Sequence, residues 1–214
     1  MSAGERLRAN DERLLGVLAA LTADDWAAPS LCAEWSNHEV LAHLVVGYGC
    51  GIGEFAAELV RRRAFDPANT ALAVRAAARR SPQRLLDDLA RLIAVPKGLG
   101  RTFPRSLLLG DHVTHELDIV HALRREPRIP TDALTAVLNT QVALPNPFVP
   151  AYRLSRGLRL VATDAQWTHG TGPTVTGRAA DLVSVLGNRP CRLGALGGDG
   201  VAALSGRVRN RTDA

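Results

Sequence analysis

The sequence is poor in lysine and in aromatic residues, and each shortage bears on function. Lys97 is its only lysine, and aromatic residues make up 4% of the chain. The formal net charge of +5 comes almost entirely from arginines that are scattered along the sequence. A nucleic-acid-binding domain usually gathers its basic residues into a patch, so we expect no nucleic-acid partner. We attribute the excess of arginine over lysine to a GC-rich genome.

Cysteine and long apolar runs are also scarce. Cys32, Cys50 and Cys191 are odd in number and form no Cys-x-x-Cys pair, so we expect neither a disulfide framework nor a thiolate zinc site. The charged start "MSAGERLRANDERLL" has no signal-peptide core. The longest apolar stretch, residues 40–60, contains a histidine, two glutamates and four glycines, which argues against a membrane span. These features predict a cytoplasmic protein with no membrane partner.

Helical signals fill the first two thirds of the chain. Apolar residues recur three and four apart over residues 5–21, and "SNHE" at 36–39 is a capping box that predicts a helix to about 62. Ser81-Pro82 predicts that the helical region 70–94 consists of two helices. Further helices are expected from Pro104 to about 124, and from 132 to 143 with Thr131 as the cap.

The pattern changes at "LPNPFVPAYR", residues 144–153, where three prolines indicate a linker. Beyond it, residues 157–164 and 167–177 have the composition of short strands joined by glycine-rich turns, and residues 178–187 return to helical spacing. We therefore predict an α+β fold. An antiparallel four-helix bundle is expected over residues 1–145, and a small α/β domain over residues 150–214.

Acids and imidazoles crowd into an otherwise apolar stretch, "GDHVTHELDIVH", at residues 110–121. On a helix, Asp111, His115 and Asp118 project from one side, and such spacing suits the chelation of one ion. His112 and Glu116 form an equally good pair, so the spacing alone does not identify the ligands. The alternative is that these groups form hydrogen bonds across the bundle.

A metal site also needs a ligand from another helix, and His43 lies beside the apolar stripe of the helix that begins at residue 36. Its surroundings carry a resemblance. The segment "CAEWSNHEVLAHL" contains C-x-x-W-[S/T]-x-x-[D/E]-V-x-x-H-L, which resembles the opening motif of the mycothiol-dependent maleylpyruvate isomerase family, part of the DinB-like superfamily. "DHVTHELDI" resembles the family's E-x-x-x-H-x-x-D-[L/I] block. The segment from "LRLVATD" to "LGNR" is similar to its C-terminal domain.

This resemblance implies a DinB-like bundle in which His43, Asp111 and His115 bind a divalent metal. Two imidazoles and one carboxylate are a usual catalytic set for zinc, with a fourth position open. The family has glutamate where this sequence has Asp111, whose side chain is shorter by one methylene. Asp118 is expected to orient a neighbouring group, and a surface salt bridge is the alternative. A fourth protein ligand, such as His112 or His121, would close the site.

The resemblance further implies mycothiol as a thiol cosubstrate and an isomerase or S-transferase reaction on a small electrophile. An anionic substrate would need a cation, for which Arg189 in "LGNR" is the candidate catalytic residue; a surface or helix-end arginine is the alternative. The alternative function is a noncatalytic metal- or thiol-binding regulator or interaction module with the same fold. The sequence leaves open the true substrate and the choice between monomer and homodimer.

Overall fold

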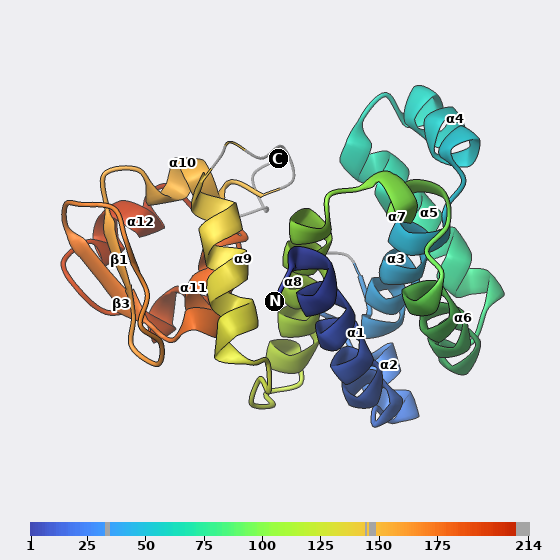
Figure 1. The fold of residues 1–214 in the computed structure, drawn as a ribbon, viewed down its shortest axis with the longest axis horizontal. Helices are drawn as coiled ribbons and strands as arrows, with labels where there is room; N and C mark the ends of the chain where they lie inside the picture. Colours follow the sequence, from blue (N-terminus) through green and yellow to red (C-terminus); the bar gives the residue numbers. More distant parts are fainter. Residues whose placement is uncertain (33–34, 144, 146–148, 209–214) are drawn as a thin grey trace. The chain divides into compact units, whose positions relative to one another are not determined.

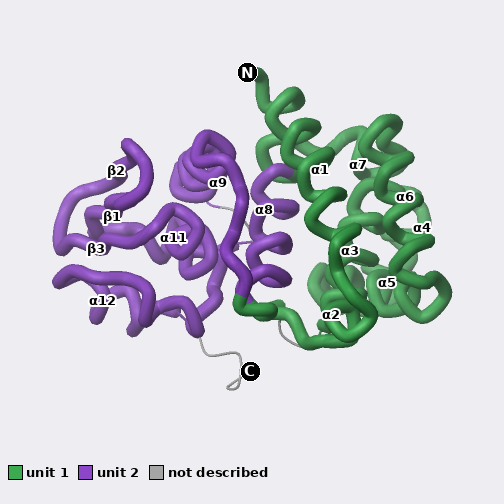
Figure 2. Tube along the Cα trace, turned by 90° about the horizontal axis from the view of Figure 1, so that it is seen from below, with its two compact units in different colours: residues 1–108, 122–124 green, residues 109–121, 125–214 purple. Residues whose placement is uncertain are grey.

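The structure, a computed structural model, describes residues 1–32, 35–143, 145 and 149–208. Its contacts group into two compact units (Figure 2). Unit 1 comprises residues 1–108 and 122–124, and unit 2 comprises residues 109–121 and 125–214. Grouping by contacts does not test independent folding, so the predicted domain limits at residues 145 and 150 stay predictions. Residues 144 and 146–148 of the predicted linker lie outside the described residues.

Unit 1 is built from helices (Figure 1): α1 (Ala3–Ala19), α2 (Ala23–Ala27), α3 (Asn37–Gly49), α4 (Ile52–Arg62), α5 (Phe65–Arg79), α6 (Pro82–Ala94) and α7 (Gly98–Thr102). α3 packs against α2, α5, α6 and α7, and α1 packs against α6. The caps predicted at Ser36 and Ser81 are confirmed, whereas Thr131 is the first helical residue of α9 (Thr131–Ala143) rather than its cap. Ser36 and Glu39 form a capping box at the start of α3, and Ser81 caps α6 with Pro82 in its first turn.

The prediction of one helix from residue 36 to about 62 is wrong, because the helix breaks after Gly49. Cys50 and Gly51 have extended backbones, and α4 begins only at Ile52. The segment that leads into α7 provides the reason. The amides of Lys97 and Leu99 donate to the carbonyls of Tyr48 and Cys50, at 3.0 and 3.1 Å, so these carbonyls bond outside the helix. Glycines on either side of Cys50 lower the cost of leaving the helical conformation.

α8 (Arg105–Ala122) is 18 residues long, and its residues 109–121 belong to unit 2. The predicted helix from Pro104 is therefore confirmed, with an end at residue 122. Most of its residues from 108 to 120 are buried. Burial on all sides explains why apolar residues occur around the whole helix, and several polar residues are buried among them. Within the described ranges, no helix combines the length and the apolar character that crossing a membrane requires.

The rest of unit 2 consists of α9 (Thr131–Ala143), α10 (Ala151–Ser155), β1 (Arg159–Ala162), β2 (Thr168–His169), β3 (Thr174–Gly177), α11 (Ala179–Leu186), the 3-10 helix η1 (Pro190–Ala195) and α12 (Val201–Ser205). The strands form one sheet in the order β2-β1-β3, in which β1 pairs antiparallel with β2 and parallel with β3. α11 is buried along its whole length and packs against α9 and α10. The predicted fold class is confirmed: a mostly helical N-terminal part precedes a small C-terminal region with a three-stranded mixed sheet.

Gly98 permits the contact that ends α3. Its φ is +47°, and a Cβ at this position would lie 1.8 Å from the carbonyl oxygen of Cys50. We expect Gly98→Ala to lower the free energy of unfolding by roughly 2 kcal/mol or more, because it adds a clash with backbone to a left-handed conformation. Gly16→Ala is the matched control. Gly16 is exposed inside α1 with open space around it, so this change should stabilise by roughly 0.5–1 kcal/mol.

Urea unfolding of the two variants beside the wild type measures both effects. Equal stability of Gly98→Ala and the wild type would show that the close approach between Gly98 and Cys50 does not exist in solution.

Candidate metal centre

His43 lies in unit 1, in the middle of α3, and is 6% exposed. Its Nδ1 is 3.1 Å from Oδ1 of Asn69 on α5, and its ring packs against Trp35 with the ring centroids 5.1 Å apart. An amide oxygen only accepts hydrogen bonds, so Nδ1 carries the proton in this pair. In the neutral ring, Nε2 is then the nitrogen with a lone pair, which is the form that binds a metal.

His115 has the same arrangement in unit 2, with a different acceptor. Its Nδ1 is 3.0 Å from Oδ2 of Asp118, one turn later on α8, so the carboxylate accepts the Nδ1 proton. Its Nε2 is 3.5 Å from Oδ1 of Asp111, one turn earlier. The predicted spacing thus brings Asp111 and His115 together as a candidate metal-binding pair. Asp111 is the more accessible of the two, since 37% of its side chain is exposed against 10% for His115.

Asp118 is fully buried and is held by Arg189, from the segment that follows α11. Arg189 Nε donates to Oδ1 at 2.7 Å and Nη2 donates to Oδ2 at 2.5 Å, a two-pronged ion pair. Arg189 Nη1 also donates to the carbonyl oxygen of Gly187. Burial by itself would raise the pKa of Asp118, but attraction to Arg189, together with hydrogen bonds from Arg189 and His115, lowers that pKa to about 2. Asp118 is therefore an anion that fixes the ring of His115.

These contacts bear on the two roles predicted for Asp118 and Arg189. Asp118 orients His115, as predicted, and it is a buried carboxylate paired with the part-buried Arg189 rather than a member of a surface salt bridge. The guanidinium of Arg189 faces Asp118, and 15% of its side chain is exposed. That Arg189 contacts an anionic substrate stays a prediction. The requirement that His43 joins Asp111 and His115 in one site stays a prediction as well, because they belong to different units.

Other polar residues in the middle of α8 are buried as well. His112 and Glu116, the alternative pair, are each 1% exposed. His121 lies on another side of the helix from His115. Its Nε2 is 4.0 Å from Oδ1 of Asp181, an atom that accepts a hydrogen bond from Arg192. Burial, followed by repulsion from Arg192, lowers the pKa of His121. The structure therefore associates His121 with Asp181 rather than with the pair formed by Asp111 and His115.

Sequence reasoning missed Asn69, which holds the ring of His43. Asn69 is 26 residues away along the chain and lies in a segment with no recognised motif. Only the packing of α3 against α5 brings the two together, so no local signal identifies it. Asp118, by contrast, is three residues from His115 on the same helix, and helical spacing alone finds it.

Removal of Arg189 tests the ion pair. Arg189→Met should lower the free energy of unfolding at neutral pH by about 3–5 kcal/mol, because it leaves the buried charge of Asp118 uncompensated. The pKa of Asp118 is depressed in the folded state, so the contribution of the pair is complete above the ordinary carboxyl pKa of 3.8 and is lost as the pH falls through about 2. The difference between variant and wild type should therefore narrow below pH 4.

Urea unfolding across this pH range provides the measurement. The double variant Asp118→Asn/Arg189→Met is the control and should lose less stability than Arg189→Met, because it buries no charge. A pH-independent difference between Arg189→Met and the wild type would contradict this assignment.

Comparison with known proteins gives two kinds of match. Residues 7–96 match the family model of the mycothiol maleylpyruvate isomerase N-terminal domain. This segment contains His43 and Asn69 but not α8. No curated protein matches the sequence at a significant level.

Two solved structures share the fold, and both are of the mycothiol-dependent maleylpyruvate isomerase. One is a histidine-to-alanine mutant with a TM-score of 0.54 and 13% identity, and the match covers 93% of this chain and 93% of that one. The other has a TM-score of 0.51 and 14% identity, over 88% of this chain and 90% of that one. The resemblance predicted from the motifs is confirmed: residues 7–96 match the model of the mycothiol maleylpyruvate isomerase N-terminal domain, and the chain shares the fold of the mycothiol-dependent maleylpyruvate isomerase.

Proposed function

We propose that this protein is a metal-dependent enzyme that uses a mycothiol-type thiol. It would either isomerise a small electrophilic substrate or, as an S-transferase, join the thiol to that substrate. In this proposal His43, Asp111 and His115 bind one divalent ion, zinc in the first instance. One observation carries the proposal. Each of the two histidines has its Nδ1 held by an oxygen acceptor, so each is in the tautomer whose Nε2 binds a metal.

The donor set fits such an ion. Metal-binding histidines usually donate their other ring N–H to a carboxylate or carbonyl oxygen, which fixes the ring and strengthens the ligand. Asn69 serves His43 in this way, and Asp118 serves His115. Asp111 adds a carboxylate next to His115. Two imidazoles and one carboxylate would leave a coordination position for a thiol, as in catalytic rather than structural zinc sites.

A bound divalent ion would stabilise the thiolate of mycothiol at neutral pH, where a free cysteine thiol, with a pKa of about 8.5, is mostly protonated. The protein's own residues would prepare the site. Asp118 keeps the proton of His115 on Nδ1, and Arg189 keeps Asp118 ionised at neutral pH. We propose Arg189 as a positioning residue on this ground, and contact with an anionic substrate as its second role.

The isomerisation needs no net gain or loss of atoms. The thiolate sulfur would add to one carbon of a cis double bond that is conjugated with a carbonyl, and the electron pair would move to the carbonyl oxygen. The former double bond is then single and can rotate. When the electron pair returns, the thiolate leaves and the trans double bond forms. An S-transferase would instead stop at the adduct, which takes a proton from solvent at the adjacent carbon.

The same fold could serve a noncatalytic metal- or thiol-binding regulator, for which a closed site with a fourth protein ligand is expected. Of the two candidates for that ligand, His121 lies beside Asp181 instead. His112, the other candidate, is tested below by substitution. We propose further that the partners are a small thiol and a small electrophile, that the protein binds neither nucleic acid nor membrane, and that it works as a monomer or homodimer in the cytoplasm.

Metal analysis tests the ligand set. The wild type, purified without chelator and dialysed, should retain close to one equivalent of zinc, and His43→Ala and His115→Ala should each lose it. His112→Ala and Glu116→Ala are matched controls from the same helix as His115 and should keep the metal. Asn69→Leu should weaken zinc binding roughly 10- to 100-fold, because it removes the acceptor that fixes His43.

If only His112→Ala and Glu116→Ala lose zinc, then His112 and Glu116, rather than Asp111 and His115, are the metal ligands on α8. Negligible zinc in the wild type and in every variant, even after reloading, would remove the basis of the proposal.

Calorimetry tests the activation of the thiol. If the bound metal stabilises the thiolate, the zinc-loaded protein should bind mycothiol more tightly as the pH rises toward the pKa of the free thiol, with release of one proton per thiol. Titrations in two buffers of different ionisation enthalpy count the released protons. His115→Ala should abolish the release. Tight binding without proton release, or release that survives in His115→Ala, would place the thiol elsewhere on the protein.

A further inference from the structure

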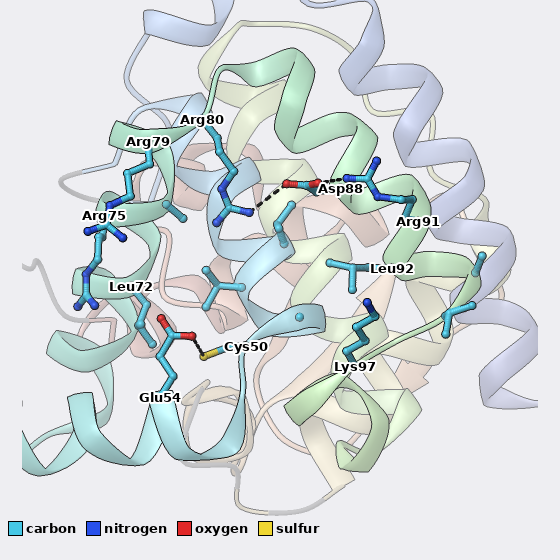
Figure 3. Close-up of a pocket in the computed structure, with 16 residues that line it drawn as sticks. Cys50, Glu54, Leu72, Arg75, Arg79, Arg80, Asp88, Arg91, Leu92 and Lys97 are labelled. Atoms are coloured by element: carbon cyan, nitrogen blue, oxygen red, sulfur yellow. Dashed lines mark hydrogen bonds and ion pairs between the residues drawn. The ribbon is translucent and has the colours of Figure 1, made fainter.

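Unit 1 contains a cavity of about 760 Å³ that involves none of the proposed metal ligands. Its lining residues come from α3, α4, α5, α6 and the segment that follows α6 (Figure 3). Figure 3 shows Arg75 and Arg79 on one side, Arg91 and Lys97 on the other, and Cys50 at one end. This volume is within the range of pockets that hold small organic molecules.

The inner wall of the cavity is apolar. Val45 and Gly49 from α3, Leu72 and Ala76 from α5, and Leu92 from α6 line it, and of these Val45, Leu72 and Ala76 are at most 5% exposed. A ligand that fits this wall must carry an apolar chain or ring, because a fully polar ligand would lose its hydration here without compensation.

The rim is basic. Five of the lining residues are arginine or lysine, and two are acidic. One of the acids, Asp88, is already neutralised, since it accepts from Arg80 at 3.0 Å and also from Arg91. The guanidinium of Arg75 forms an ion pair with Glu58 at 2.6 Å. Glu58 also accepts from Arg61, so its charge is already compensated.

Two cations at the rim have no acid of their own. In the part of the chain that the structure describes, Arg79 and Lys97 form neither an ion pair nor a side-chain hydrogen bond, and both are exposed. Arg79 projects from the end of α5, and Lys97 from the segment between α6 and α7. Their charges are therefore available to a ligand that enters the cavity.

The thiol at the end of the cavity adds no negative charge. Burial, and then repulsion by Glu54, raise the pKa of Cys50 to about 11, so the thiol is protonated at neutral pH. Its Sγ lies 3.7 Å from Oε2 of Glu54, toward which it donates. Among the described lining residues, Glu54 is the one acid without an arginine partner. The lining thus has one unpaired negative charge, on Glu54, and two unpaired positive charges, on Arg79 and Lys97.

We propose that this cavity is a binding site for an amphipathic anion: a small molecule with an apolar chain or ring that ends in a carboxylate or a phosphate. The apolar part lies against Val45, Leu72 and Ala76, and the anionic end lies at the rim with Arg79 and Lys97. The volume of about 760 Å³ is that of a small-molecule pocket, so the proposed ligand is a small molecule rather than a partner helix.

Isothermal titration calorimetry on the full-length protein tests the proposal. The probes are dodecanoate and dodecyl phosphate, below the concentrations at which they aggregate, and dodecyltrimethylammonium as a cation with the same chain. The anions should bind with one-to-one stoichiometry, and the cation should not bind. Whichever anion binds more tightly identifies the head group. Arg79→Glu/Lys97→Glu should weaken binding of the anions roughly 10-fold or more.

Arg128→Glu/Arg159→Glu, which changes the net charge equally at exposed positions of unit 2, is the control and should bind as the wild type does. Val46→Trp fills the cavity from its half-buried lining position without a change of charge and should abolish binding. His115→Ala should leave it unchanged, so a failure of the metal proposal does not affect this result.

Three outcomes would overturn the site. They are no binding of either anion by the wild type, equal binding of the cation, and the same affinity in Arg79→Glu/Lys97→Glu as in its control.

Discussion

The buried negative charge of Asp118 is the constraint on which the candidate centre in unit 2 depends. An unpaired carboxylate inside a protein costs several kcal/mol, so Asp118 must be compensated from more than one direction. Arg189 supplies the charge and two hydrogen bonds, from 71 residues away along the chain, and His115 supplies a third. Because the third comes from Nδ1, the same compensation determines which nitrogen of His115 bears the proton. An electrostatic requirement of folding thus sets the chemistry of a candidate ligand.

The two histidines reach the same protonation pattern by different routes, and only one route is visible in the sequence. His115 finds its acceptor three residues on, where helical periodicity alone puts Asp118 on the same side. His43 finds Asn69 on a different helix, and that contact exists only because α3 packs against α5. The family motif indicated His43 without its partner. Local spacing and motifs therefore predict which residue types gather, whereas partners from other helices require the tertiary structure.

The same distinction explains how much of the fold was predictable. Helix starts that depend on a cap and its neighbours, such as Ser36 and Ser81, were predicted, because their hydrogen bonds close within three residues. The end of α3 was not, because it depends on amides from residues 97 and 99 that bond to its last carbonyls. Composition and glycine-rich turns predicted the strands. They did not predict the order of the strands, since the parallel pairing of β1 with β3 depends on how the segment between them crosses.

The arginine content, which the sequence suggested was a matter of genome composition, has a structural use as well. Three buried carboxylates, Glu58, Asp118 and Asp181, are each held by arginine. Arginine suits this task, because its planar group keeps its charge in any protein environment and can donate two parallel hydrogen bonds to one carboxylate. Cations used in this way are neutralised by their carboxylate partners. For the prediction of ligands, arginines and lysines without an acidic partner are therefore more useful than the net charge. In unit 1, two such residues, Arg79 and Lys97, lie at the rim of an apolar cavity.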